Sequence, residues 1–207
     1  MTKKKAVIFD LDNTIYPVAS IAKRLFSDLY RLIETDGRYT GSVEEIKQSI
    51  ERKPFQVVAR EFHFDEELTS NALALLADLE YVDAMAPFDD YPLTKAIDCL
   101  KFLVTTGFTK LQWSKIKQLE LQADFEACYV VDPASSQQTK KDVFAEIMEK
   151  YRLAPGELLV VGDDLHSEIK AGQELGIDTV VYDYAGKFGS LEGHRVISNY
   201  GRLAAFI

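Results

Sequence analysis

Two aspartates separated by one residue follow the first apolar run, in Val7-Ile8-Phe9-Asp10-Leu11-Asp12. Side chains two apart on a strand point to the same face, so Asp10 and Asp12 are expected together unless the backbone turns at once. Two carboxylates about 4 Å apart repel by roughly 4 kcal/mol at an effective dielectric of 20. A fold tolerates this repulsion if a cation binds or one carboxyl is protonated. The pair indicates a metal or acid–base site, or else a turn at Asp12-Asn13-Thr14.

A second acidic pair follows another apolar run, in Leu159-Val160-Val161-Gly162-Asp163-Asp164. Asp164 fits the N-cap of a following helix, whereas Asp163 has no such structural explanation. If Asp163 faces Asp10 and Asp12, three carboxylates converge. Oxygen ligands of this kind suit Mg²⁺ better than Zn²⁺, so the pattern predicts a magnesium site.

Hydroxyl and ammonium groups that could hold a phosphate occur after other apolar runs. Thr105 and Thr106 end the run that begins at Phe102, and they offer hydroxyl and backbone N–H donors. Lys140 precedes a helical pattern, with Lys141 as an adjacent competitor that the sequence does not separate from it. These donors are typical of a site that binds phosphoryl oxygens.

Short apolar runs alternate with helical patterns along most of the chain. Five runs read as buried strands: 5–9, 102–105, 128–131, 158–161 and 179–182. Three helices are predicted between the later runs: 109–119, 141–151 and 165–175. This alternation indicates a mostly parallel sheet. Because such a sheet binds ligands at the carboxyl ends of its strands, the acidic, threonine and lysine residues are expected at one edge, together with Asp132.

One long interval has no strand pattern. Between Thr14 and about Phe88 only helical periodicity appears, which predicts a small all-helical insert after the first strand. Pro87 and Pro92 mark the return to the sheet, and Leu93–Leu100 is predicted as the next helix.

Composition excludes some partners. The 207-residue chain has a formal net charge of −9, which argues against a nucleic-acid polymer or an anionic membrane as its partner. No apolar segment approaches the length of a membrane span, and no signal peptide is visible, so a cytoplasmic location is expected. We expect a monomer or a small homo-oligomer.

Together these motifs resemble the haloacid dehalogenase-like hydrolase superfamily. Its four motifs match in order: Asp10-Leu-Asp12-Asn-Thr14, Thr105 after a strand, Lys140 before a helix, and Gly162-Asp163-Asp164 with Glu168. The resemblance implies a three-layer α/β/α Rossmann-like core of residues 1–15 and 89–207. Residues 16–88 then form a helical cap inserted after the first strand. The segment from Asp12 to Pro17 is also similar to the nucleotidase-like branch of this superfamily.

The resemblance also implies roles for individual residues. Asp10 is the expected nucleophile, and Asp12 the general acid and base whose backbone carbonyl also binds Mg²⁺. Asp163 completes the metal ligands, and Thr105, Thr106 and Lys140 hold the phosphate. Asp164 and Glu168 support these groups, with Glu168 orienting Lys140 or a metal-bound water.

These roles describe a Mg²⁺-dependent phosphatase acting on a small soluble phosphate ester. Because a halide leaves without a proton, the presence of Asp12 favours phosphoryl chemistry over dehalogenation. Two alternatives stay open: a phosphotransferase or phosphomutase of the same superfamily, and a phospho-receiver domain that does not turn over. The order of the motifs disfavours the receiver domain.

Overall fold

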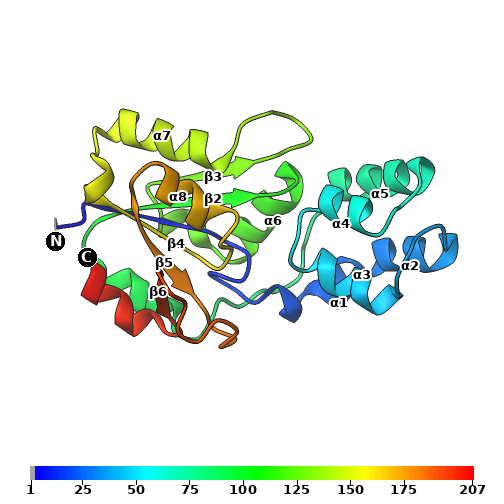
Figure 1. The fold of residues 1–207 in the computed structure, drawn as a ribbon, viewed down its shortest axis with the longest axis horizontal. Helices are drawn as coiled ribbons and strands as arrows, with labels where there is room; N and C mark the ends of the chain where they lie inside the picture. The colour runs from blue at the N-terminus through cyan, green and yellow to red at the C-terminus, as the bar shows by residue number, and fades with distance from the viewer. Residues whose placement is uncertain (1–2) are drawn as a thin grey trace.

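The computed structural model describes residues 3–207, and its centre is a sheet of six parallel strands (Figure 1). The strands are β1 (Ala6–Phe9), β2 (Leu100–Thr106), β3 (Ala127–Val131), β4 (Leu158–Gly162), β5 (Asp178–Tyr182) and β6 (Arg195–Ile197). Their order across the sheet is β3-β2-β1-β4-β5-β6, and every neighbouring pair is parallel. The carboxyl ends of β1, β2 and β4 are therefore adjacent.

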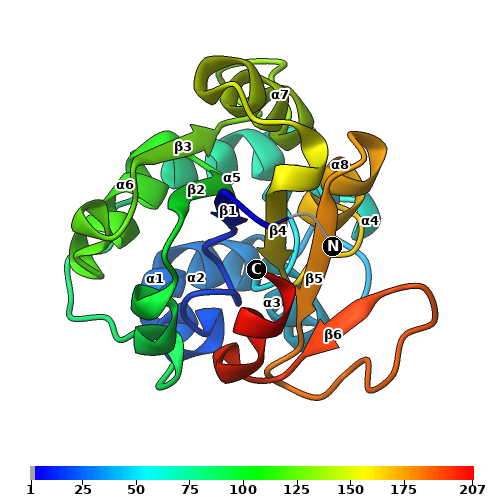
Figure 2. The same cartoon turned by 90° about the vertical axis from the view of Figure 1, so that its left-hand side faces the viewer.

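Helices cover both faces of the sheet. Alternate residues of β1 enter two separate apolar clusters: Val7 and Phe9 pack in one, and Ala6 and Ile8 in the other. The core helices are α6 (Thr109–Gln118), α7 (Lys140–Tyr151) and α8 (Glu168–Glu174). Side chains of α6 join the first cluster and those of α7 and α8 the second. Figure 2 shows α7 and α8 beyond one face of the sheet and α6 beyond the other. The predicted three-layer parallel α/β fold is confirmed.

Five helices lie between β1 and β2, and we call them the helical insert. They are α1 (Ala22–Leu25), α2 (Ser27–Asp36), α3 (Val43–Ile50), α4 (Phe55–Glu61) and α5 (Glu66–Asp78). In Figure 1 the helical insert extends from one end of the sheet, in blue to cyan colours. Local sequence sets its helix ends: Ser42 and Glu45 form a capping box on α3, Asp65 caps α5, and left-handed Gly37 ends α2.

Two sequence predictions differ from the structure. The helix predicted over Leu93–Leu100 is wrong, because residues Tyr91–Ala96 form a 3-10 helix and Leu100 already pairs with Ala6 in the sheet. Strand β6 is short and lies in a region of the chain without a clear sequence pattern, so the sequence did not predict it. No helix among residues 3–207 is long and apolar enough to cross a membrane.

The last 3-10 helix, Tyr200–Phe206, supports the segment that follows β1. The buried hydroxyl of Tyr200 donates to the backbone oxygen of Thr14 at 2.6 Å, and its ring stacks on Tyr182 with 4.3 Å between centroids. Asp90 accepts from both partners, from the Tyr182 hydroxyl at 2.9 Å and the Tyr200 backbone N–H at 2.8 Å. The C-terminus thus holds in place the turn that contains Asp12.

We predict that Tyr200→Phe lowers the free energy of unfolding by about 1–3 kcal/mol, because the Thr14 carbonyl loses a buried donor. Urea denaturation measures the change. Tyr184→Phe is the matched control, since Tyr184 is half exposed. Equal stability of Tyr200→Phe and the unmodified protein would contradict the supporting role of this hydrogen bond.

Candidate active site

Asp10 lies at the carboxyl end of β1, where its backbone N–H donates to the Val161 oxygen of β4 at 3.0 Å. Its side chain is buried and its Oδ1 accepts from Lys140 Nζ at 2.6 Å. The same ammonium donates to Glu168 Oε2 at 2.7 Å. Burial alone would lower the pKa of Lys140, but the two carboxylates outweigh it and raise the pKa above its usual range. Lys140 is therefore a charged group between β1 and α8.

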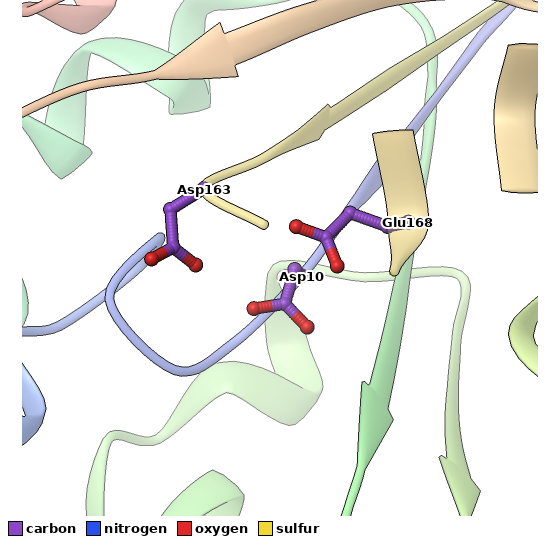
Figure 3. A group of neighbouring side chains, drawn as sticks. All are labelled: Asp10, Asp163 and Glu168. Atoms are coloured by element: carbon purple, nitrogen blue, oxygen red, sulfur yellow. The ribbon is translucent and has the colours of Figure 1, made fainter. Parts of the chain in front are cut away.

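Three carboxylates converge at this edge of the sheet, as Figure 3 shows for Asp10, Asp163 and Glu168, and we call these three the acidic group. One oxygen from each of Asp10, Asp163 and Glu168 lies within 4.8 Å of the others. Burial raises the pKa of Asp10 to about 7, although Lys140 opposes the shift. Burial, followed by the charge of Asp10, raises the pKa of Asp163 to about 8. Crowded carboxylates of this kind resist ionisation unless a cation neutralises them, which fits a divalent metal with oxygen ligands.

Besides pairing with Lys140, Glu168 stabilises the turn that follows β4. Its Oε1 accepts from the Asp164 backbone N–H at 2.8 Å. The side chain passes directly over Gly162, where an added Cβ would lie 2.1 Å from Glu168 Oε1. Glycine is required there because any larger residue would displace this carboxylate. The Asp164 carboxylate accepts from the His166 backbone N–H at 2.8 Å. Helix α8 begins at Glu168 rather than at the predicted Leu165, so Ser167 and not Asp164 occupies its N-cap position.

Asp12 points away from the acidic group, because the backbone turns as soon as β1 ends. The next residue, Asn13, has the left-handed φ of 57°. The hydroxyl of Tyr16 and the ammonium of Lys115 both donate to Asp12 Oδ1, the lysine at 2.8 Å. Gln112 Nε2 donates to Oδ2 at 2.8 Å. Glu168, rather than the Asp12 carboxylate, is thus the third member of the acidic group.

The surroundings of Asp12 shift its pKa in the opposite direction from that of Asp10. Burial alone would raise the pKa, but the charge of Lys115 and the hydrogen bonds from Lys115, Tyr16 and Gln112 lower it below its usual range. Asp12 is therefore held as an ionised carboxylate with a donor on each oxygen.

The sequence did not indicate that Gln112 and Lys115 belong to the site. Both are buried on α6, on the same side of the helix as Leu111 and Ile116. Polar residues three apart on an apolar helical stripe are a signal that could have found them, because a buried lysine needs a partner. Gln112 Nε2 also lies 2.5 Å from Thr105 Oγ1, and so links the Asp12 turn to the end of β2.

The remaining predicted residues are placed as follows. Thr105 is buried and Thr106 half-buried at the end of β2. Lys140, and not Lys141, reaches Asp10, since Lys141 is an exposed partner of Glu174. The Asp132 carboxylate accepts from the Thr109 N–H and hydroxyl, each at 2.9 Å, and so fixes the start of α6.

The predicted site residues and the two α6 partners of Asp12 line one cleft of ≈ 800 Å³: Asp10, Asp12, Thr105, Thr106, Gln112, Lys115, Asp132, Lys140, Asp163, Asp164 and Glu168. Its floor is the carboxyl edge of the sheet, and part of its wall comes from the helical insert. A volume of this size accommodates a small organic molecule. The fold and this cleft define a three-layer α/β protein with a buried lysine, a group of three carboxylates and a separately paired carboxylate at one edge of its parallel sheet.

Comparisons with known proteins agree with this class. The family model for haloacid dehalogenase-like hydrolases matches residues 4–176, and the chain belongs to this family. It is 25% identical to glyceraldehyde 3-phosphate phosphatase of Pyrococcus furiosus, over 93% of this chain and 85% of the relative. It is 23% identical to N-acylneuraminate-9-phosphatase of Rattus norvegicus, over 88% and 83%. The magnesium-bound structure of HAD-hydrolase YfnB from Bacillus subtilis aligns with TM-score 0.65 and 18% identity, over 99% of this chain and 98% of that one.

We predict that Lys115→Met lowers the free energy of unfolding by about 2–4 kcal/mol, because the Asp12 carboxylate loses the ammonium that compensates its burial. Urea denaturation at neutral pH measures the change. Lys117→Met on the exposed side of the same helix is the control and is expected to have little effect. If both variants are equally stable, the Lys115–Asp12 pair does not stabilise the fold.

Proposed function

We propose that the protein is a Mg²⁺-dependent phosphatase that hydrolyses a small phosphomonoester through an aspartyl-phosphate. The observation that carries this proposal is the position of the Asp10 carboxylate in the cleft. One of its oxygens accepts from Lys140, and it belongs to the acidic group. Two relatives with named substrates are phosphatases of small phosphate esters, which supports the same reaction class here.

In the first half-reaction, Asp10 Oδ2 attacks phosphorus while the bond to the leaving oxygen breaks. Asp10 Oδ1 is held by Lys140, so the other oxygen is the one available for attack. Asp12 takes up one proton from solvent when the substrate binds and passes it to the leaving oxygen, so that the leaving group departs as an alcohol. In the second half-reaction Asp12 removes a proton from water, whose oxygen attacks phosphorus and releases Asp10 and inorganic phosphate. The donors on Asp12 suit its ionised form, which is the form that acts as a base.

Thr105, Thr106 and Lys140 are proposed to bind the nonbridging phosphate oxygens. All three line the cleft on elements adjacent to β1. Lys140 is charged, and its contact with Asp10 places its ammonium next to the attacking oxygen. Charge that develops on the phosphoryl group would therefore meet a preorganised cation.

The residues present fit a magnesium ion. Asp10 and Asp163 would bind it through carboxylate oxygens, and Asp12 through its backbone carbonyl. Glu168 is engaged by Lys140 and the Asp164 N–H, so its proposed role is to orient the lysine. When bound, the ion would neutralise the crowded carboxylates and the phosphate charge, and would keep Asp10 ionised. The magnesium-bound relative supports this assignment of the metal.

Residues 16–88 are proposed to act as the cap of this site, on a core of residues 1–15 and 89–207. The two connections lie together, since the Phe88 N–H donates to the Ile15 oxygen at 2.8 Å. Several residues of the helical insert line the same cleft as Asp10, which supports binding of the leaving group between the cap and the core. A cytoplasmic location and the oligomeric state stay predictions.

Asp10→Asn is predicted to reduce hydrolysis of an aryl phosphate by about 10³-fold or more, because the amide cannot form the covalent intermediate. Steady-state kinetics with Mg²⁺ measure the loss. The control is Asp98→Asn, an exposed aspartate outside the cleft. Full metal-dependent turnover by Asp10→Asn would refute the proposed mechanism.

Removal of divalent metal with EDTA is predicted to abolish activity, and added Mg²⁺ to restore it. In Asp163→Asn the Mg²⁺ concentration for half-maximal activity should rise by about 10-fold or more, because one carboxylate ligand is lost. A titration of activity against free Mg²⁺ gives both results. Activity that persists in EDTA, or an unchanged Mg²⁺ requirement in Asp163→Asn, would count against this metal site.

Transfer of the phosphoryl group to a second alcohol shares the first half-reaction and is the alternative outcome. Product analysis with an excess of acceptor alcohol separates the two reactions. Inorganic phosphate as the main product identifies the hydrolase.

A further inference from the structure

The wall of the cleft that faces the catalytic floor is built around one turn of the helical insert. Residues 51–54 connect α3 to α4, and Pro54 precedes the first residue of α4. Arg52 and Lys53 of this turn are exposed, and both line the cleft. The turn therefore presents two cations toward the space above Asp10.

The two cations differ in what already neutralises them. Lys53 Nζ pairs with Glu61 Oε2 at 2.6 Å. Within residues 3–207 the Arg52 guanidinium makes neither an ion pair nor a side-chain hydrogen bond. The neighbouring Glu51 carboxylate is approached by the Tyr30 hydroxyl at 3.4 Å. An uncompensated guanidinium lining a cleft is notable in a chain with a net charge of −9, where acidic partners are plentiful.

Apart from the residues at the carboxyl edge of the sheet and the turn 51–54, much of the cleft lining is apolar, with Gln56 and Lys187 as polar members. The helical insert contributes Phe26, Phe55 and Val57, and the core contributes Phe108, Leu165 and Phe188. Val57 is 40% exposed and adds to the apolar lining of the cleft. The volume of ≈ 800 Å³ is far larger than a phosphate group needs. The leaving group that fills it should therefore be bulky and largely apolar.

On the basis of the proposed phosphatase function, we propose that the substrate is a phosphomonoester whose leaving group joins an apolar body to a second anionic group, and that Arg52 binds this second anion. A guanidinium binds a carboxylate or phosphate through two parallel hydrogen bonds, which gives orientation as well as affinity. The reacting phosphate lies at Asp10 and Lys140, so the substrate is held at both ends with its apolar part between the phenylalanines.

The test uses pairs of aryl phosphates that have the same shape and differ by one charge. Each pair is a carboxyaryl phosphate and its uncharged carboxamide, in a phenyl series and a longer naphthyl series. The value of kcat/KM is measured with Mg²⁺ for the unmodified protein, Arg52→Gln, Arg52→Glu and the control Arg60→Gln. Arg60 is an exposed arginine of α4 that does not line the cleft.

We expect Arg52→Gln to lower kcat/KM for the carboxylate ester of at least one series by about 10-fold, mainly through KM, since a hydrogen-bonded ion pair is lost. The carboxamide should change much less, Arg52→Glu should widen the difference, and Arg60→Gln should affect neither ester. Equal losses for carboxylate and carboxamide would show that Arg52 acts on the reacting phosphate and would overturn the proposal, as would no loss at all. Absence of turnover of all four esters by the unmodified protein would instead overturn the proposed phosphatase function on which this inference rests.

Discussion

The buried ammonium of Lys140 is the interaction on which the site depends. It joins Asp10 at the end of β1 to Glu168 at the start of α8, and it is itself the first residue of α7. Without this cation two carboxylates would be buried against each other, which a fold does not tolerate. Gly162 is tied to the same arrangement, because Glu168 occupies the space that its side chain would need. One ion-pair triad thus fixes β1, α7 and α8 relative to one another at this edge of the sheet.

Two aspartates only two residues apart have different surroundings and therefore different chemistry. Asp10 lies among carboxylates, and its pKa is raised to about 7. Asp12 lies against α6, where Lys115, Gln112 and Tyr16 stabilise its ionised form and lower its pKa. The early turn of the backbone after β1 makes this separation possible. A carboxyl group with a raised pKa and a carboxylate with a lowered pKa are thus obtained from a single short motif.

The sequence predicted the layered parallel sheet because apolar runs and helical stripes are local patterns. It also predicted that Asp10, Thr105, Lys140 and Asp163 share one edge, since parallel strands end on the same side. It did not predict the partners of Asp12, because Gln112 and Lys115 come from a helix about 100 residues away and their contacts depend on tertiary packing. The choice between Lys140 and Lys141 likewise depended on which side of α7 faces Asp10.

The hydrogen bond between Ile15 and Phe88 has a consequence for how the chain can vary. It brings the start and the end of the helical insert close together. Relative to the core, these some seventy residues therefore form a single closed loop. The entropy of closing such a loop rises only with the logarithm of its length, by roughly 0.6 kcal/mol for each doubling. An insert of another length or shape could therefore replace this one with little loss of core stability. The side chains at the carboxyl edge of the sheet could be retained while the opposite wall of the cleft is exchanged.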